Sequence, residues 1–241
     1  MHENNVNLHH HVPFPETQHG QRLSFFDPSM RSAEFVPKDA SLHNPFAIEA
    51  FLNKKLRWVT LGGQYDWTQK VYPSTPPPSF PPDVAGLVEG LIPAMKAEAA
   101  IVNLYSPGDT LSLHRDVSEE CNKPLVSISL GCDAIFLVGH DATETNRDLE
   151  GFKKDGTEPR AAAMRLRSGD LVVMAGEART AWHSVPQVVA GTCPDWMADW
   201  PCLTVADQDA EGAVTKYEAW KGWMAGKRIN LNVRQMRDDA P

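Results

Sequence analysis

A chain of 241 residues, 42% hydrophobic and 22% charged, can bury a sizeable core and has the composition of an ordinary soluble globular protein. No apolar run approaches the length that crosses a bilayer, so no membrane partner is expected. The formal net charge of -8 argues against nucleic-acid binding through bulk electrostatics, although it leaves room for a local basic groove. Four cysteines at wide spacings, without a Cys-x-x-Cys pair, indicate reduced thiols rather than a disulfide framework.

The first 45 residues are polar, contain prolines and show no sustained periodicity, which predicts an irregular N-terminal extension. Residues 45–52 follow with the composition of a short helix, for which Asn44 is the candidate N-cap. The basic run 54–63 then predicts a strand that ends in a Gly-Gly turn.

A proline-rich segment separates this first part from the rest of the chain. Six prolines within residues 72–82 exclude a helix or a central strand there and indicate a loop or a polyproline-like link. The apolar residues of segment 83–96 recur at helical spacing, which predicts one amphipathic helix that Pro93 kinks or ends.

From residue 100 onward, short β-rich runs alternate with turn residues. This texture predicts an all-β core with flanking helices (α+β), in which the strands form a double-sheet jelly roll or barrel. The expected strands are 100–105, 111–114, 125–130, 134–138, 163–166, 170–174, 183–189 and 228–234. Two interruptions, 139–160 and 191–227, are too long for hairpin loops, so each is a surface insertion or a small extra element.

A candidate metal site begins with the pair His114-x-Asp116. Side chains at i and i+2 of a strand point to the same face, so both can approach one ion. One more histidine would complete two imidazoles and a carboxylate, a set that leaves positions on iron open for a co-substrate and dioxygen. Six of the nine histidines lie in the N-terminal stretch and His140 opens a polar insertion, which leaves His183 by elimination. The pair alone is a weak signal, because surface turns often contain it.

A second signal lies near the C-terminus, in the run 228–234. In a strand, its four polar residues would share one face, and they are Arg228, Asn230, Asn232 and Arg234. Such a face is costly to bury unless an anion binds there, and arginine forms a bidentate fork onto carboxylates such as the two of 2-oxoglutarate. The alternative is an edge strand whose polar face lies in water.

At these residues the chain resembles the AlkB family of iron and 2-oxoglutarate dioxygenases. The similarity covers roughly residues 97 to 237, and its pieces occur in family order. They are Asn103-x-Tyr105-x-x-Gly108-Asp109, His114-x-Asp116, Ser127-Ile128-Ser129-Leu130-Gly131, Ala134-Ile135-Phe136, Ser168-Gly169-Asp170-Leu171-Val172-Val173-Met174, His183 and Arg228-x-Asn230-x-x-x-Arg234. Residues 56–62, 65–67 and 123–125 are similar to the subfamily of the first mammalian AlkB homologue.

The resemblance implies a role for each matching residue. Iron would be bound by His114, Asp116 and His183. The co-substrate 2-oxoglutarate would be bound by Asn103, Tyr105, Arg228, Asn230 and Arg234. Among these, Arg228 would pair with its distal carboxylate, while Arg234 would lie near the C1 carboxylate or the substrate.

The resemblance also implies a double-stranded β-helix (jelly roll) with an N-terminal nucleotide-recognition lid. The expected parts are an extension (1–45), a lid with its supporting helix (46–96) and the catalytic core (97–241), as one compact unit. Trp58 and Tyr65 would belong to the lid over the modified nucleotide.

Two departures from the wider family put the substrate base in question. Ser118, followed by Glu119, stands where bacterial members carry a second acid that helps to read the base, and Gly63 stands at a common lid tyrosine. Ser118 and Glu119 are therefore candidate substrate residues.

The function that follows from the resemblance is oxidative demethylation of N-methylated bases in nucleic acid (tRNA, other RNA or DNA). Such an enzyme uses Fe(II), 2-oxoglutarate and O2, and it releases formaldehyde, succinate and CO2. A base inside a duplex could not reach the iron, so the substrate would be single-stranded, looped or flipped. Lys54, Lys55 and Arg57 are candidate phosphate contacts.

Three other functions are alternatives to this one. The first is a hydroxylase of a protein or small molecule with the same iron site, and the second is a catalytically silent jelly-roll binding module. The third, a zinc hydrolase, would leave Arg228 and Asn230 without a role. Residues 1–17 lack the features of a secretory signal, so we expect an intracellular protein. The resemblance implies the nucleus, the cytoplasm or the mitochondrion as its compartment, and we expect a monomer.

Overall fold

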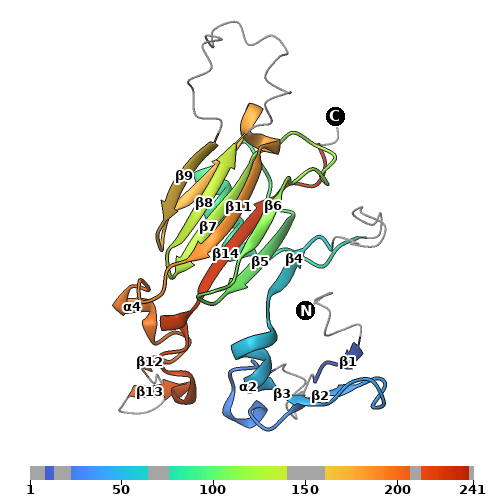
Figure 1. The fold of residues 1–241 in the computed structure, drawn as a ribbon, viewed down its shortest axis with the longest axis vertical. Helices are drawn as coiled ribbons and strands as arrows, with labels where there is room; N and C mark the ends of the chain where they lie inside the picture. The colour runs from blue at the N-terminus through green and yellow to red at the C-terminus, as the bar shows by residue number, and fades with distance from the viewer. Residues whose placement is uncertain (1–8, 14–22, 65–75, 140–160, 207–212, 239–241) are drawn as a thin grey trace, which may run out of the picture.

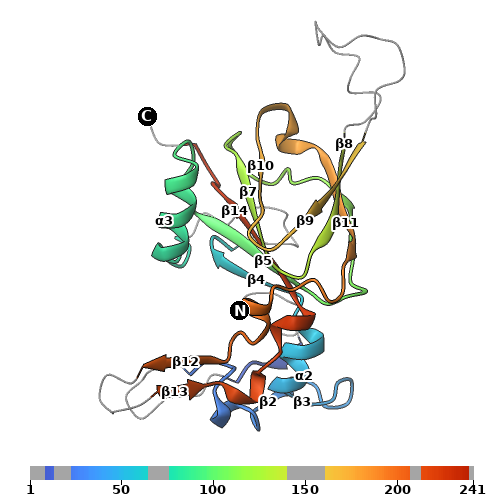
Figure 2. The same ribbon diagram turned by 90° about the vertical axis from the view of Figure 1, so that its left-hand side faces the viewer.

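Two antiparallel sheets form the centre of the protein, seen in a computed structural model that describes residues 9–13, 23–64, 76–139, 161–206 and 213–238. Figures 1 and 2 show the sheets as a sandwich. The larger sheet has the order β10 (Leu171–Met174), β7 (Leu125–Gly131), β14 (Arg228–Arg234), β5 (Ala99–Tyr105) and β4 (Trp58–Gly62). The smaller sheet has the order β6 (Leu111–His114), β11 (Trp182–Val188), β8 (Ala134–Gly139) and β9 (Ala161–Leu166).

The jelly-roll prediction is confirmed by this topology. Each of the eight runs expected from residue 100 onward forms a strand, with ends that differ by at most two residues. Strands that are far apart in the chain alternate in space: β14 lies between β5 and β7, and β11 lies between β6 and β8. This interleaving is that of a double-sheet jelly roll. Of the strand predicted over 54–63, residues 58–62 form β4, which pairs with β5. The start of the prediction is wrong, because Lys54 and Lys55 lie in a π-helical turn.

The apolar residues of alternate strand positions fill the space between the two sheets. Leu125 and Met174 of the larger sheet pack in one cluster with Phe136, Leu166 and Val185 of the smaller sheet. Because strand side chains alternate between faces, the opposite residues of the larger sheet need a separate cover.

That cover is α3 (Pro82–Leu91), which lies against the outer face of the larger sheet (Figure 2). Its Val88 is fully buried and packs with Val126 of β7 and Val233 of β14. The helix begins at a proline, whose missing N–H is not needed in a first helical turn, and it ends before Pro93 as predicted. None of the helices in the described segments is long and apolar enough to span a membrane.

The N-terminal segment has more regular structure than its sequence predicts. It contains η1 (Pro28–Met30) and a three-stranded sheet of β1 (His10–His11), β2 (Glu34–Pro37) and β3 (Phe46–Ala47). These strands are too short to produce a periodic pattern, which explains why the segment was expected to be irregular.

The helix expected over 45–52 with Asn44 as its N-cap is wrong in its bounds. Pairing of Phe46 with Phe35 places 46–47 in β3, and helical structure begins with α2 (Ile48–Ala50), continued by the π-helical turn η2 (Phe51–Lys55). The N-cap is Ala47, without a side-chain bond, and the carbonyl of Asn44 instead lies 3.1 Å from His10 Nε2.

The second predicted interruption is a small extra element. It holds α4 (Asp195–Ala198), β12 (Leu203–Ala206), β13 (Ala213–Lys216), η5 (Glu218–Trp220) and η6 (Met224–Gly226). Its Trp220 and Trp223 share a buried cluster with N-terminal residues such as Met30 and Phe51. Figure 1 accordingly shows both segments at the same end of the sandwich. Of the other interruption, predicted as 139–160, Gly139 ends β8 and residues 140–160 lie outside the described residues.

Gly131 offers a test of how β7 is held beside β14. Its φ of +84° disfavours L side chains, and an added Cβ would clash with the carbonyl oxygen of Lys227 and with Met224 Cε. Gly131→Ala is expected to lower the free energy of unfolding by about 3 kcal/mol, measured by urea denaturation. Gly108→Ala is the control, because Gly108 has a φ of +96° but open space around an added Cβ; it should cost about 1 kcal/mol. Equal losses would contradict the clash.

Candidate active site

Three potential metal ligands meet at one end of the smaller sheet. His114, the last residue of β6, pairs directly with His183 of β11, and Asp116 follows in the loop after β6. The Nε2 atoms of His114 and His183 each lie 3.9 Å from an oxygen of the Asp116 carboxylate. One ligand atom from each residue lies within 4.8 Å of the others, so the three could hold one ion. The side chain of His114 is 33% exposed and that of His183 only 5%.

Both histidines are oriented by main-chain carbonyl oxygens. The Nδ1 of His114 lies 2.8 Å from the oxygen of Ser112, and the Nδ1 of His183 lies 3.0 Å from that of Ala181. A carbonyl oxygen only accepts, so Nδ1 carries the proton in each ring and the lone pair of Nε2 is directed at the candidate metal position.

Electrostatics favour the protonation states that bind metals. Burial by itself raises the pKa of Asp116, but Arg234, His183, His114 and Arg179 outweigh it and hold this pKa below its usual range. Burial also lowers the pKa of His183, which keeps its imidazole neutral. An ionised carboxylate and a neutral imidazole are the forms that ligate a divalent cation.

A buried cationic cradle lies on the larger sheet, where Arg228 of β14 pairs with Tyr105 of β5. Arg228 is 1% exposed, and its Nη2 donates to Ser129 Oγ at 3.0 Å. Its Nε and Nη1, and the hydroxyl of Tyr105, have no hydrogen-bond partner among the described residues. Burial raises the pKa of Tyr105 to about 12, so its phenol stays a neutral donor. Unpaired buried donors are costly, which fits a cradle for an anion.

The polar face of β14 continues beside this cradle. Asn230 lies between Asn103 of β5 and Ser129 of β7, and Asn103 in turn pairs with Trp58 of β4. Because β14 is a central strand and its four polar residues are at most 9% exposed, the alternative of an edge strand with its polar face in water is wrong.

Arg234, at the far end of β14, connects this face to the metal candidates. Its Nη2 lies 3.6 Å from Asp116 Oδ2, and its Nη1 donates to Glu119 Oε1 at 2.8 Å. Glu119 also accepts from Arg179 Nη2 at 2.7 Å, and its side chain is 1% exposed. Glu119 is therefore a buried bridge between two guanidinium groups.

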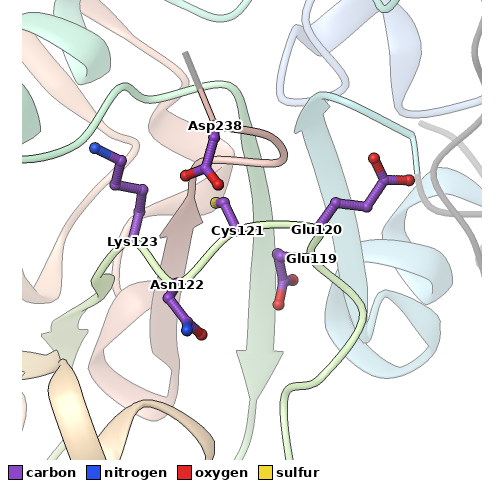
Figure 3. Close-up of a pocket in the computed structure, with 6 residues that line it drawn as sticks. All are labelled: Glu119, Glu120, Cys121, Asn122, Lys123 and Asp238. Atoms are coloured by element: carbon purple, nitrogen blue, oxygen red, sulfur yellow. The ribbon is translucent and has the colours of Figure 1, made fainter. Parts of the chain in front are cut away.

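Figure 3 shows the loop that carries Glu119, in which the side chains of Glu119 and Glu120 diverge and Cys121 lies near Asp238. Ser118 lies half-buried, with its hydroxyl 3.3 Å from Glu119 Oε1. The expected contacts of Ser118 and Glu119 with a substrate stay predictions, and Glu119 has both its oxygens occupied within the protein. Tyr65, expected in the lid, lies outside the described residues.

One residue that the sequence reasoning missed is Arg179. It belongs to η4 (Gly176–Thr180), four residues before His183, and it is 4% exposed. The run Gly-Glu-Ala-Arg-Thr has the composition of a solvated turn. Its closeness to His183 in the chain was the one available signal, and nothing in the sequence indicates that Arg179 is buried.

The cluster predicts that His183→Ala abolishes tight binding of a divalent metal, because the most buried of the three ligand side chains is lost. Calorimetric titration with Mn(II), which avoids oxidation, measures this binding. His43→Ala removes a histidine of the N-terminal segment and should leave the affinity unchanged. Tight Mn(II) binding by the His183 variant would contradict the cluster.

The cradle predicts that Arg228→Met weakens 2-oxoglutarate binding roughly 10- to 100-fold, since a hydrogen bond to a charged group contributes about 1.5–3 kcal/mol. Titration of the Mn(II)-loaded protein with 2-oxoglutarate measures this affinity without turnover. Arg167 is an exposed arginine; Arg167→Met is the control and should bind as the wild type does. An unchanged affinity in the Arg228 variant would remove Arg228 from the cradle.

The chain matches known proteins along most of its length. The family model of the 2OG-Fe(II) oxygenase superfamily matches residues 10–234. The "N6-methyladenosine RNA demethylase ALKBH" of Cryphonectria parasitica is 49% identical over 235 residues, which cover 97% of this chain and 100% of that protein. The "tRNA demethylase abh1" of Schizosaccharomyces pombe is 42% identical over 201 residues, but the match spans 80% of this chain and only 57% of the relative.

A solved structure supports the fold. "The structure of OsALKBH1" superposes with a TM-score of 0.51 at 23% identity, over 74% of this chain and 77% of the other. The matched length and the identity to a relative that the chain covers completely show its family. The chain belongs to the 2OG-Fe(II) oxygenase superfamily and, within it, to the AlkB homologues.

Proposed function

We propose that this protein is an Fe(II)- and 2-oxoglutarate-dependent demethylase that removes methyl groups from N-methylated bases in RNA or DNA. The observation that carries the proposal is the pairing of two features in one sandwich. They are the cluster of His114, Asp116 and His183, and the buried cradle in which Arg228 and Tyr105 present donors without a partner among the described residues.

The residues present fit the groups that this chemistry needs. Two imidazole nitrogens and one carboxylate oxygen are the donor set of non-haem Fe(II) oxygenases, and they leave coordination positions open. Arg228 and the phenol of Tyr105 would hold one carboxylate of 2-oxoglutarate. They would donate from Arg228 Nε and Nη1 and from the Tyr105 hydroxyl, which have no acceptor among the described residues. When bound, Fe(II) and 2-oxoglutarate supply the activation of O2 that oxidises an N-methyl group.

The protein's own contribution is orientation and shielding. The metal cluster comes from the smaller sheet and the loop after β6, whereas the cradle comes from the larger sheet. Tyr105 lies close enough to both Arg228 and Asp116 for their charges to act on its pKa. This arrangement supports a site in which the sandwich would bring co-substrate and metal together. Burial of Arg228 and His183 keeps water away from the reacting groups and strengthens the electrostatic interactions around them.

Support for a nucleic-acid substrate comes from the relatives and from the edge of the larger sheet. One relative is named as an RNA demethylase and another as a tRNA demethylase. Trp58 is partly exposed on the edge strand β4, where a base could stack. Just before it, Lys54, Lys55 and Arg57 are exposed and would meet phosphates. Lys55 already lies 4.7 Å from the centre of the Phe46 ring, and Arg57 pairs with Asp109.

A second candidate function is hydroxylation of a protein or small molecule by the same iron site. The net charge of -8 favours it, because an acidic surface repels the phosphate backbone.

We also propose that residues 46–96 act as a lid over the substrate, that the protein is a monomer and that it acts inside the cell.

The decisive experiment is mass spectrometry of nucleosides from total tRNA, other RNA and DNA after incubation with Fe(II), ascorbate and 2-oxoglutarate. We expect one methylated nucleoside to decrease, with formaldehyde and succinate released in equal amounts. His183→Ala, incubated in parallel, should leave every nucleoside unchanged. If no methylated nucleoside decreases while the protein still turns over 2-oxoglutarate, demethylation is wrong and the hydroxylase is favoured.

A further inference from the structure

The loop that carries Asp116 has no strand pairing to hold it in place. His114 and His183 belong to strands, but residues 115–124 form neither strand nor helix. A main-chain hydrogen bond from Glu120 to Met236, of 2.9 Å, holds the middle of the loop to the C-terminal segment. A metal site needs its ligands held within about 0.5 Å, so other contacts must fix Asp116.

Arg179 supplies contacts along the whole loop. Its Nη1 donates to the main-chain oxygen of Asp116 at 3.0 Å, and its Nε donates to that of Lys123 at 2.9 Å. Its Nη2 donates to the Glu119 carboxylate at 2.7 Å. One buried guanidinium thus binds the first part, the middle and the end of the loop.

A second arginine connects the same two segments, but it lies in the loop and donates to the segment that carries Arg179. Arg115, from the loop, donates through Nε to the main-chain oxygen of Thr180 at 2.8 Å, and its Nη2 lies 3.3 Å from Thr180 Oγ1. Its guanidinium carbon lies 5.8 Å from the centre of the Trp182 ring. Thr180 directly follows Arg179 and precedes His183 by three residues. The two arginines therefore tie the Asp116 loop to the segment that leads into His183.

We propose that Arg179 is a positioning residue of the metal centre, which fixes Asp116 relative to His183. It acts directly on the main chain of Asp116. It also acts through Glu119, whose second oxygen holds Arg234 beside the Asp116 carboxylate. The inference rests on the proposed metal centre but is independent of the substrate.

The geometry explains why this residue is an arginine. Its acceptors lie in three directions around one planar group, and the five N–H donors of a guanidinium can reach all of them. A lysine has its three donors on one atom, so Arg179→Lys keeps the charge that Glu119 requires but cannot reach both ends of the loop.

The test measures the affinity for Mn(II) by electron paramagnetic resonance of the free ion, without 2-oxoglutarate or nucleic acid. Arg179→Lys and Arg179→Gln are expected to bind Mn(II) roughly 10- to 100-fold more weakly, as is common when residues that orient metal ligands are lost. Arg115→Gln should show a smaller loss. Arg237→Gln is the control with unchanged affinity, because Arg237 pairs with Glu120 of the same loop but its side chain is 48% exposed.

Thermal unfolding followed by circular dichroism shows which variants fold. Arg179→Gln leaves the two carboxylates of Asp116 and Glu119 in excess over Arg234 and can unfold the protein, whereas Arg115→Gln leaves that buried network intact. Wild-type affinity in a folded Arg179 variant, or in Arg115→Gln if neither Arg179 variant folds, would overturn the positioning role. A wild-type protein that binds no Mn(II) would refute the metal centre itself.

Discussion

Burial of positive charge beside the metal candidates is the constraint on which the rest of the structure depends. Arg228, Arg234 and Arg179 are each at most 4% exposed, and an unbalanced guanidinium in a low-dielectric interior is costly. Glu119 and Asp116 balance the cations at one end of β14. Arg228, at the other end, keeps two donor atoms without a described partner. An anion beside Arg228 would accept hydrogen bonds from these donors, and the co-substrate would supply one.

The interleaved topology makes this arrangement possible. The last strand of the chain, β14, inserts between β5 and β7, so residues more than a hundred positions apart become neighbours on one face. Leu231 and Val233 of β14 face the outer side, where they pack in one cluster with Val88 of α3. One strand thus serves two environments, because its side chains alternate between the faces.

Much of the core and of the site could be predicted from sequence because the side chains of a strand alternate between its faces, so apolar and polar residues recur with a period of two. That period exposed the polar face of 228–234. The inference that His114 and Asp116 share one face of a strand is wrong in its geometry, because β6 ends at His114; Asp116 lies in the following loop, which nevertheless brings it to the two histidines. Strands of two residues, such as β1 and β3, leave no such pattern, and pairing of Phe46 with Phe35 overrode the helical composition of 45–52. The burial of Arg179 depends on partners in a distant loop, which local composition does not encode.

The unequal exposure of the two halves of the site has a kinetic consequence. His114 lies on β6, at the end of the smaller sheet's strand order, with a third of its side chain in solvent, whereas Arg228 lies on a central strand and is almost fully enclosed. A large molecule bound over His114 would stand between bulk solvent and Arg228. With the proposed roles, depth would then set the order of arrival: the small dicarboxylate would enter before the polymer docks, and the spent diacid would depart after the polymer has gone.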